Sequence, residues 1–186
     1  MLSKEQREIW PELCDPDFPE LYEVVALYET PNNTTHLFEP LPFRYNDGGR
    51  KDAGFKGKAR DCVARSIAIA SGLSYSEVYK ALAIGNAKQR ASSRTPKRTR
   101  SANNGVNTQR KWFKQFMINM GFEWVPTQGI GSTTRTYLSK GELPKGNIIV
   151  AVRKHYAAVI NGVLNDTADF SKGRRVCVVG YWIKKT

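Results

Sequence analysis

The chain has 186 residues, of which 40% are hydrophobic and 11% aromatic, so it can build one packed domain, with or without an extension. Its formal net charge of +12 favours an acidic partner, and no stretch approaches the ~20 apolar residues of a membrane span. The acidic start and the three cysteines without a CxxC pair argue against a signal peptide, a disulfide framework and a structural zinc site, so we expect a cytoplasmic protein without metal or cofactor.

The charge is divided unevenly along the chain. Residues 1–39 carry nine acidic and two basic side chains, a net of −7, whereas the remainder carries eight acidic and twenty-seven basic ones, a net of +19. From Val78 to Gly121 there are ten lysines or arginines and no acid. This asymmetry indicates either a polyanionic partner or an acidic segment that folds back on the basic body.

Residues 1–44 are expected to form an acidic N-terminal extension ahead of a domain that spans 45–186. Within the extension, 21–28 is apolar and could be a strand or a short helix. The two prolines of 39–43 are typical of an extended linker. A polar, glycine-rich loop, 46–58, then leads to the first element of the domain.

Two helices are expected after this loop. The alanine- and isoleucine-rich run 62–71 is apolar on most faces, which predicts a buried helix, and Gly72 suits the position just beyond its end. Ser74 and Glu77 have the spacing of a capping box and should open a second helix. We expect Gly85 to close that helix.

The segment 86–107 is basic with almost no apolar content, which predicts a mobile loop. Thr108 can cap a third helix, whose apolar face extends to Met120. Lysine and arginine among serine and threonine can neutralise phosphates, so the candidates for polyanion binding are Arg90, Arg94, Lys97, Arg98, Arg100, Arg110 and Lys111. A solvated basic loop without a ligand is the open alternative, and no signature of base-specific recognition is present.

After Gly121 the pattern changes to short β-branched and aromatic runs, which predict strands. Asn161-Gly162 predicts a tight hairpin between two of them, and 131–146 is expected to hold a short helix and a turn. Helices that precede an antiparallel sheet indicate an α+β fold. The expected strands are 122–125, 147–153, 155–160, 162–165 and 176–183.

Three residues in this arrangement have the chemistry of a catalytic triad. Cys62 opens the first helix, where the positive end of the helix dipole favours the thiolate. His155 opens a strand and can accept the thiol proton, and the predicted hairpin returns Asp166 to its side, where a carboxylate can orient the imidazole. The order of cysteine, histidine and carboxylate therefore predicts nucleophilic catalysis.

Each assignment has an alternative. Cys62 could be a small core residue, and His155 could be a structural histidine. His36, in a turn-rich segment, is the weaker candidate for the base. Asn165 and then Asp169 are the second and third choices for the orienting residue, since either could instead stabilise a turn.

The segments DCVARSIAIASG and HYAAVINGVLNDT resemble the papain-like cysteine peptidase superfamily, by order and local pattern over roughly residues 55–170. They look most like the leader peptidases of peptide exporters, and CVARSIA also resembles a helix of ovarian-tumour-type deubiquitinases. The resemblance implies a papain-like α+β fold with the nucleophile helix packed on an antiparallel sheet. It implies Cys62 as nucleophile, His155 as base and Asp166 as orienter of a peptidase or isopeptidase whose substrate is a protein or peptide.

One position departs from that superfamily, whose members usually carry a glutamine six residues before the cysteine to complete the oxyanion hole. Here that residue is Lys56, so the Cys62 N–H could supply one donor and Asn46 or Lys56 the other. The alternative function is an inactive scaffold of the same fold that binds nucleic acid or an acidic protein assembly, as a phage or bacterial accessory protein would. In a third interpretation, the acidic residues 1–39 cover a basic cleft until a partner displaces them.

Overall fold

The computed structural model describes residues 39–89, 101–128 and 135–185. The expectations for 1–38, His36 among them, lie outside the described residues, as do those for Arg90, Arg94, Lys97, Arg98 and Arg100. Among the described helices, none has both the length and the apolar character needed to cross a membrane.

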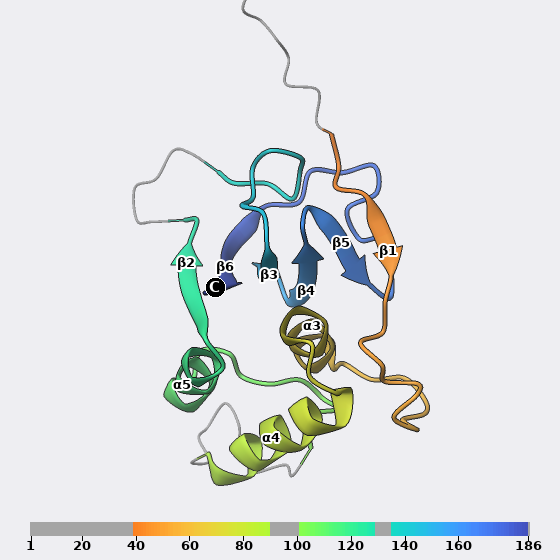
Figure 1. Ribbon diagram of the computed structural model, residues 1–186, viewed down its shortest axis with the longest axis vertical. Helices are drawn as coiled ribbons and strands as arrows, with labels where there is room; N and C mark the ends of the chain where they lie inside the picture. Colours follow the sequence, from red (N-terminus) through yellow and green to blue (C-terminus); the bar gives the residue numbers. More distant parts are fainter. Residues whose placement is uncertain (1–38, 90–100, 129–134, 186) are drawn as a thin grey trace, which may run out of the picture. The chain divides into compact units, whose positions relative to one another are not determined.

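The described residues build one sheet from the strands β1 (Phe43–Tyr45), β2 (Phe122–Pro126), β3 (Asn147–Val152), β4 (His155–Ile160), β5 (Val163–Asp166) and β6 (Val178–Lys184). Their order is β1-β5-β4-β3-β6-β2 (Figure 1). β4 pairs antiparallel with β3 and β5, and β6 pairs antiparallel with β3 and β2. β1 runs parallel to β5, so the sheet is mixed.

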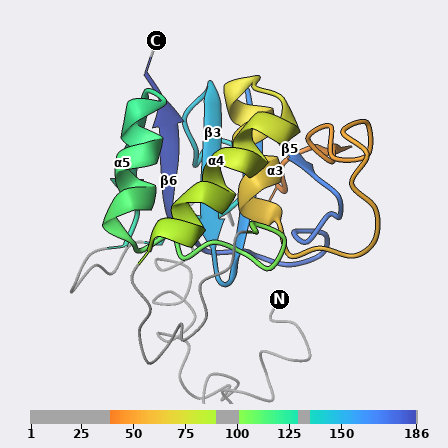
Figure 2. The ribbon, with the colours of Figure 1, turned by 90° about the horizontal axis from the view of Figure 1, so that it is seen from below.

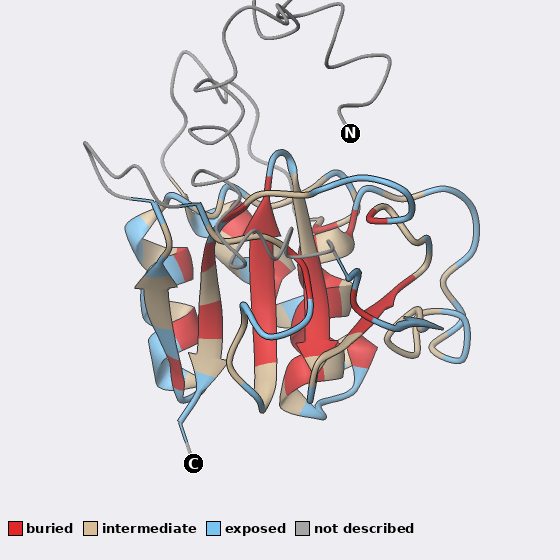
Figure 3. Ribbon diagram, turned by 90° about the horizontal axis from the view of Figure 1, so that it is seen from above, coloured by how far each residue is buried: buried red, intermediate tan, exposed pale blue. Residues whose placement is uncertain are grey.

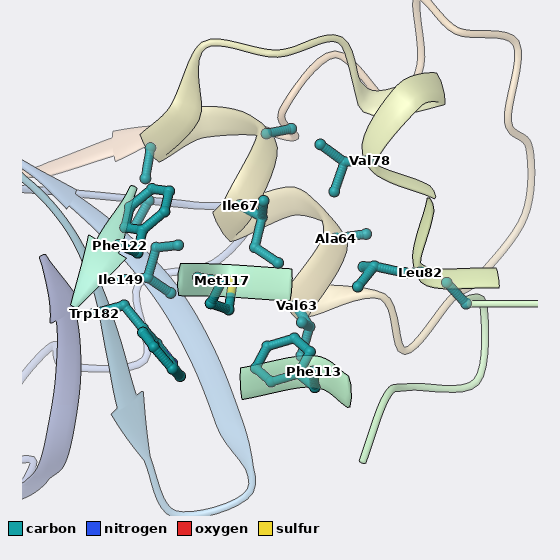
Figure 4. Close-up of a cluster of buried hydrophobic side chains, with 14 of the residues drawn as sticks. Val63, Ala64, Ile67, Val78, Leu82, Phe113, Met117, Phe122, Ile149 and Trp182 are labelled. Carbon is teal, nitrogen blue, oxygen red and sulfur yellow. The ribbon is translucent and has the colours of Figure 1, made fainter. Parts of the chain in front are cut away.

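Three helices, α3 (Cys62–Ser71), α4 (Tyr75–Lys88) and α5 (Lys111–Asn119), cover one face of this sheet (Figure 2). α3 and α5 pack directly on the strands, and α4 packs on those two helices. The interface is a cluster of apolar side chains from both layers, including Ile67 of α3, Met117 of α5, and Ile149 and Trp182 of the sheet (Figure 4). Burial of this cluster fixes the height of α3 above the centre of the sheet.

The opposite face of the sheet is also buried. Ile148, Val150, Val159 and Leu164 pack there with side chains of the loops, such as Leu138. The central strands are therefore buried on both faces (Figure 3). This explains why β3 is a continuous apolar run rather than an alternating one.

The predicted starts of the first two helices are confirmed. α3 begins at Cys62, and Gly72 ends it in a left-handed conformation with φ 77°. The Ser74 hydroxyl accepts a hydrogen bond from the Glu77 N–H while the Glu77 carboxylate accepts one from the Ser74 N–H, which is the expected capping box.

The predicted end of the second helix at Gly85 was wrong, because α4 continues to Lys88. A Cβ atom at Gly85 would lie 2.2 Å from the ring of Trp112, so this glycine serves close packing between α4 and α5. The third helix starts at Lys111 with Arg110 at its N-cap, rather than at Thr108. Thr108 instead lies beside the side chain of Tyr156 and acts to lower its pKa, against the larger effect of burial.

The segment 86–107 differs from the expected mobile loop where it is described. Its first residues belong to α4, and Ala102 is fully buried. The Asn86 amide donates hydrogen bonds to the carbonyls of Ser101 at 2.9 Å and Gly105 at 3.3 Å. These bonds hold the end of the segment, 101–107, against α4.

Two further expectations need correction. The boundary after residue 44 falls inside β1, which belongs to the sheet, so the extension and the domain do not divide there. No helix occurs in 135–146, the described part of the segment expected to contain one. That part instead makes isolated β-bridges, Tyr137 with Cys177 and Ser139 with Pro40.

Candidate active site

Cys62 is the first residue of α3 and lies against the start of β4. Its thiol lies beside the side chain of His155 and the backbone N–H of Tyr156, and both lower its pKa. The contact exists because α3 packs on β4, where the small side chain of Ala158 belongs to the apolar cluster between helices and sheet. The structure thus brings together the two residues that are ninety-three positions apart in the sequence.

His155 and Asp166 face each other across the β4–β5 hairpin. Asn161 and Gly162 form the turn with positive φ angles of 49° and 81°, as the sequence predicted, and Ala158 pairs with Asn165. His155 Nε2 lies 2.5 Å from Asp166 Oδ2. Because Nε2 is engaged by the carboxylate, Nδ1 is the ring nitrogen left to face the thiol.

The pKa values of the thiol and the imidazole are shifted towards an ion pair. Burial alone would raise the pKa of Cys62, but the hydrogen bonds from His155 and the Tyr156 N–H, with the positive charges of His155 and Arg65, lower it. Burial alone would lower the pKa of His155, but its bonds to Asp166 and Cys62 raise it to about 9. Both directions favour thiolate and imidazolium at neutral pH.

The orienting carboxylate is itself fixed by its neighbours. Asp166 Oδ1 accepts a hydrogen bond of 2.6 Å from the Thr167 N–H and lies 3.6 Å from Arg65 Nη1. Its side chain is 7% exposed. Phe170 packs edge-on against the His155 ring, with 4.9 Å between ring centroids, and limits the rotation of the imidazole.

A buried ionic cluster surrounds Asp61, the residue directly before Cys62, and it was not predicted from the sequence. The Asp61 carboxylate accepts hydrogen bonds from Arg50 Nε at 2.9 Å and from the Tyr75 hydroxyl at 2.5 Å, and it lies 3.0 Å from Arg65 Nε. Burial and the Asp61 carboxylate raise the pKa of Tyr75, so its hydroxyl stays protonated and donating. The i,i+4 spacing of Asp61 and Arg65 was the available signal.

This cluster leaves the start of α3 uncapped. Asp61 occupies the N-cap position, but its carboxylate makes no capping hydrogen bond because it is engaged by the two arginines and Tyr75. The first N–H groups of a helix lack intrahelical partners. Those of α3 therefore remain available beside the thiol, where they can stabilise negative charge.

A cleft of about 660 Å³ opens at the thiol. Its lining residues include Arg60, Cys62, Gln109, Trp124, Lys154 and His155. A second cleft of about 490 Å³ lies beyond the imidazole, lined by Asp166, Phe170 and Arg175 among others. His155 lines both, so one ring can exchange protons with groups in either cleft.

The other candidates for the orienting and oxyanion roles lie elsewhere. The Asn165 side chain accepts a hydrogen bond of 3.2 Å from the Asn46 amide, and Asp169 caps the backbone at Ser171. Neither Asn46 nor Lys56 lines the cleft at the thiol. Gln109, which the sequence reasoning did not single out, brings a side-chain amide to that cleft.

The described basic candidates, Arg110 and Lys111, lie at the start of α5 and do not line the cleft. Within the described residues, no group of three or more histidine, cysteine or acidic side chains is placed to hold a metal ion. Comparison of the chain with protein-family models, with curated proteins and with solved structures found no match.

Proposed function

We propose that the protein is a cysteine-dependent hydrolase of peptide or isopeptide bonds, with Cys62 as nucleophile, His155 as acid and base, and Asp166 as orienter. The observation that carries the proposal is one continuous chain of contacts. The Cys62 thiol lies beside His155 in one cleft and interacts with it, and His155 Nε2 lies 2.5 Å from the buried Asp166 carboxylate. The lowered pKa of Cys62 supports the same assignment, because the thiolate is the reactive form.

The chemistry divides into two steps. In the first, the Cys62 thiolate attacks the carbonyl carbon, the carbonyl oxygen becomes an oxyanion, and the N–H groups at the start of α3 stabilise it. The carbon–nitrogen bond then breaks as the His155 imidazolium gives its proton to the leaving amine, which leaves a thioester.

In the second step, neutral His155 takes a proton from a water molecule, and the resulting hydroxide attacks the thioester. The carbon–sulfur bond breaks, the carboxylic acid product leaves, and the thiolate–imidazolium pair is restored. Asp166 keeps its proton-free form throughout and holds the ring by its 2.5 Å contact with Nε2.

The test is the rate of Cys62 alkylation by iodoacetamide between about pH 5 and about pH 9, resolved by residue with mass spectrometry. We expect Cys62 to titrate below an ordinary thiol, and His155→Ala to shift that titration upward. Cys177, which is free and half-buried, serves as the internal control and should react alike in both proteins.

His36→Ala is the matched histidine control and should leave the titration of Cys62 unchanged. A slow Cys62 whose titration does not respond to His155→Ala would overturn the proposal. The basic scaffold without catalytic activity would then be the remaining function, tested by salt-dependent binding of polyanions.

A further inference from the structure

The charged side chains that line the cleft at Cys62 are basic. Among its lining residues are Arg60, Arg65 and Lys154, and none of the lining residues is aspartate or glutamate. Arg65 already forms ion pairs with Asp61 and Asp166. In the described part of the chain, no ion pair engages Arg60 or Lys154, and both are exposed.

These two cations reach the cleft from two separate segments of the chain. Arg60 directly precedes Asp61 and Cys62, and its backbone N–H is anchored to the Asn103 carbonyl at 2.8 Å. Lys154 lies in the turn between β3 and β4, immediately before His155. One cation therefore lies near Cys62 in the chain and the other adjoins His155, so a substrate at the thiol would lie in a positive field.

The backbone at Lys154 adds an independent observation. Its φ angle is 60°, in the left-handed region that glycine and asparagine adopt most easily and that costs other residues free energy. Lysine is a poor choice for such a turn on conformational grounds. Its side chain at the mouth of the cleft gives a reason for its presence that the turn itself does not.

Apart from Cys62 and His155, the remaining lining residues are uncharged, and several of them are apolar. Val106, Trp124 and Val179 line the same cleft, and Val179 is 43% exposed although it is a large hydrophobic residue. The cleft volume of about 660 Å³ is suited to a few residues of an extended chain. Two cations beside apolar walls fit a short peptide better than the long regular track of phosphates in a nucleic acid.

We propose that the cleft selects peptides with an aspartate or glutamate side chain next to the scissile carbonyl, recognised by Arg60 and Lys154. This specificity rests on the proposed function, since it assigns the substrate class of the same site. Each carboxylate–cation contact is partly exposed to water, so the expected preference is about three- to tenfold rather than absolute.

The experiment uses three tripeptide acyloxymethyl ketones that differ only in the residue next to the reactive carbonyl, which is glutamate, glutamine or lysine. The Cys62 thiolate displaces the carboxylate leaving group of the probe and forms a thioether, which intact mass spectrometry counts over time. We expect the glutamate probe to label Cys62 about three- to tenfold faster than its glutamine isostere, and the lysine probe to be slowest.

Two variants that remove a positive charge identify the side chains responsible for the glutamate preference. Arg60→Gln and Lys154→Asn should each lower the ratio of glutamate to glutamine rates, and the double variant should bring it close to one. Asparagine tolerates the left-handed conformation at residue 154, so the fold is preserved. Both probe rates of a variant are measured on the same thiolate, so a change in thiolate reactivity alters both rates and leaves their ratio unchanged. Lys80→Gln, exposed on α4 away from the cleft, is the matched control and should keep the wild-type ratio.

Every other outcome contradicts the proposed specificity. Equal rates for glutamate and glutamine probes, or a preference that persists in the double variant, would overturn the specificity while Cys62 still responds to His155→Ala. A Cys62 that iodoacetamide labels slowly, without dependence on His155, would overturn both the specificity and the proposed function. If a single-stranded oligothymidylate blocks the glutamine probe in wild type but not in the double variant, the cations bind phosphates and the peptide assignment is wrong.

Discussion

The guanidinium of Arg65 lies 3.6 Å from the carboxylate of Asp166, the residue that contacts the His155 ring. The same side chain reaches Asp61 with Nε at 3.0 Å, so one arginine on α3 joins the helix start to the β4–β5 hairpin. Its side chain is 12% exposed and the two carboxylates are nearly buried. The start of α3, where Cys62 lies, and Asp166 are therefore linked by charge as well as by packing.

We expect Arg65→Met to lower the free energy of unfolding by about 3–5 kcal/mol, because it leaves two buried carboxylates without their shared cation. Arg65→Lys should cost less, since it keeps the charge and loses the fork geometry. Urea unfolding followed by tryptophan fluorescence measures both.

Lys185→Met is the control for this comparison, because it breaks a 2.9 Å pair with Glu123 whose side chains are 69% and 54% exposed. Its cost should stay below about 1 kcal/mol. Equal losses from Arg65→Met and Lys185→Met would show that the buried cluster contributes no more than a surface pair.

Asp166→Asn should lower the pKa of His155 from about 9 towards its ordinary value, because the carboxylate is a principal cause of the raised pKa. With less imidazolium at neutral pH, the pKa of Cys62 should rise and turnover should fall by about 10²-fold or more. The titration of the imidazole protons by NMR measures the first effect, and iodoacetamide kinetics measures the second. Asp169→Asn, which removes a carboxylate that does not touch His155, should change neither.

The raised pKa of His155 also predicts how stability depends on pH. The folded pKa of about 9 exceeds the unfolded value near 6.5, so the imidazolium contribution is fully present below about pH 6.5 and is lost as the pH rises through about 9. The stability difference between wild type and Asp166→Asn should therefore shrink across that interval. The lowered pKa of Cys62 acts with the opposite sign, so both proteins in this comparison also carry Cys62→Ser, which removes that contribution.

Urea midpoints at about pH 6 and about pH 9.5, under reducing conditions, test this pH dependence. A difference between wild type and Asp166→Asn that is constant or grows with pH would contradict the raised folded pKa of His155. Asp169→Asn again provides the reference, and its difference from wild type should not change between the two pH values.

Gly85→Ala should destabilise the protein by about 1–3 kcal/mol, although alanine is normally the better helix former. The reason is the 2.2 Å approach of a Cβ atom to the Trp112 ring. Thermal unfolding measures the loss, and Trp112→Leu in the same chain should recover part of it by removing the ring. A stabilising Gly85→Ala would show that α4 and α5 can separate at this point without cost.

Local patterns predicted the elements that carry the site, and the reasons are physical. Asn161-Gly162 specifies a tight turn, so the pairing of β4 with β5 and the approach of Asp166 to His155 followed from adjacent residues. The helix start at Cys62 followed from the change between a polar loop and an apolar run.

Features that depend on distant partners were not predictable in this way. β1 is a short, exposed strand without apolar alternation, and its parallel pairing with β5 joins residues more than a hundred positions apart. A glycine is typical of a helix end, and only the close approach of the Trp112 ring explains why Gly85 instead lies inside a helix. The third donor to Asp61, Tyr75, belongs to the next helix and gave no local signal.

The small side chain of Ala158 lets the core control the distance between Cys62 and His155. Ala158 is fully buried in the apolar cluster that joins α3 to the sheet, on the strand that carries His155. A larger residue at position 158 would push α3 away from β4 and separate Cys62 from His155, with both side chains still present. The reactivity proposed for Cys62 is thus adjustable from inside the core, by the size of one buried side chain.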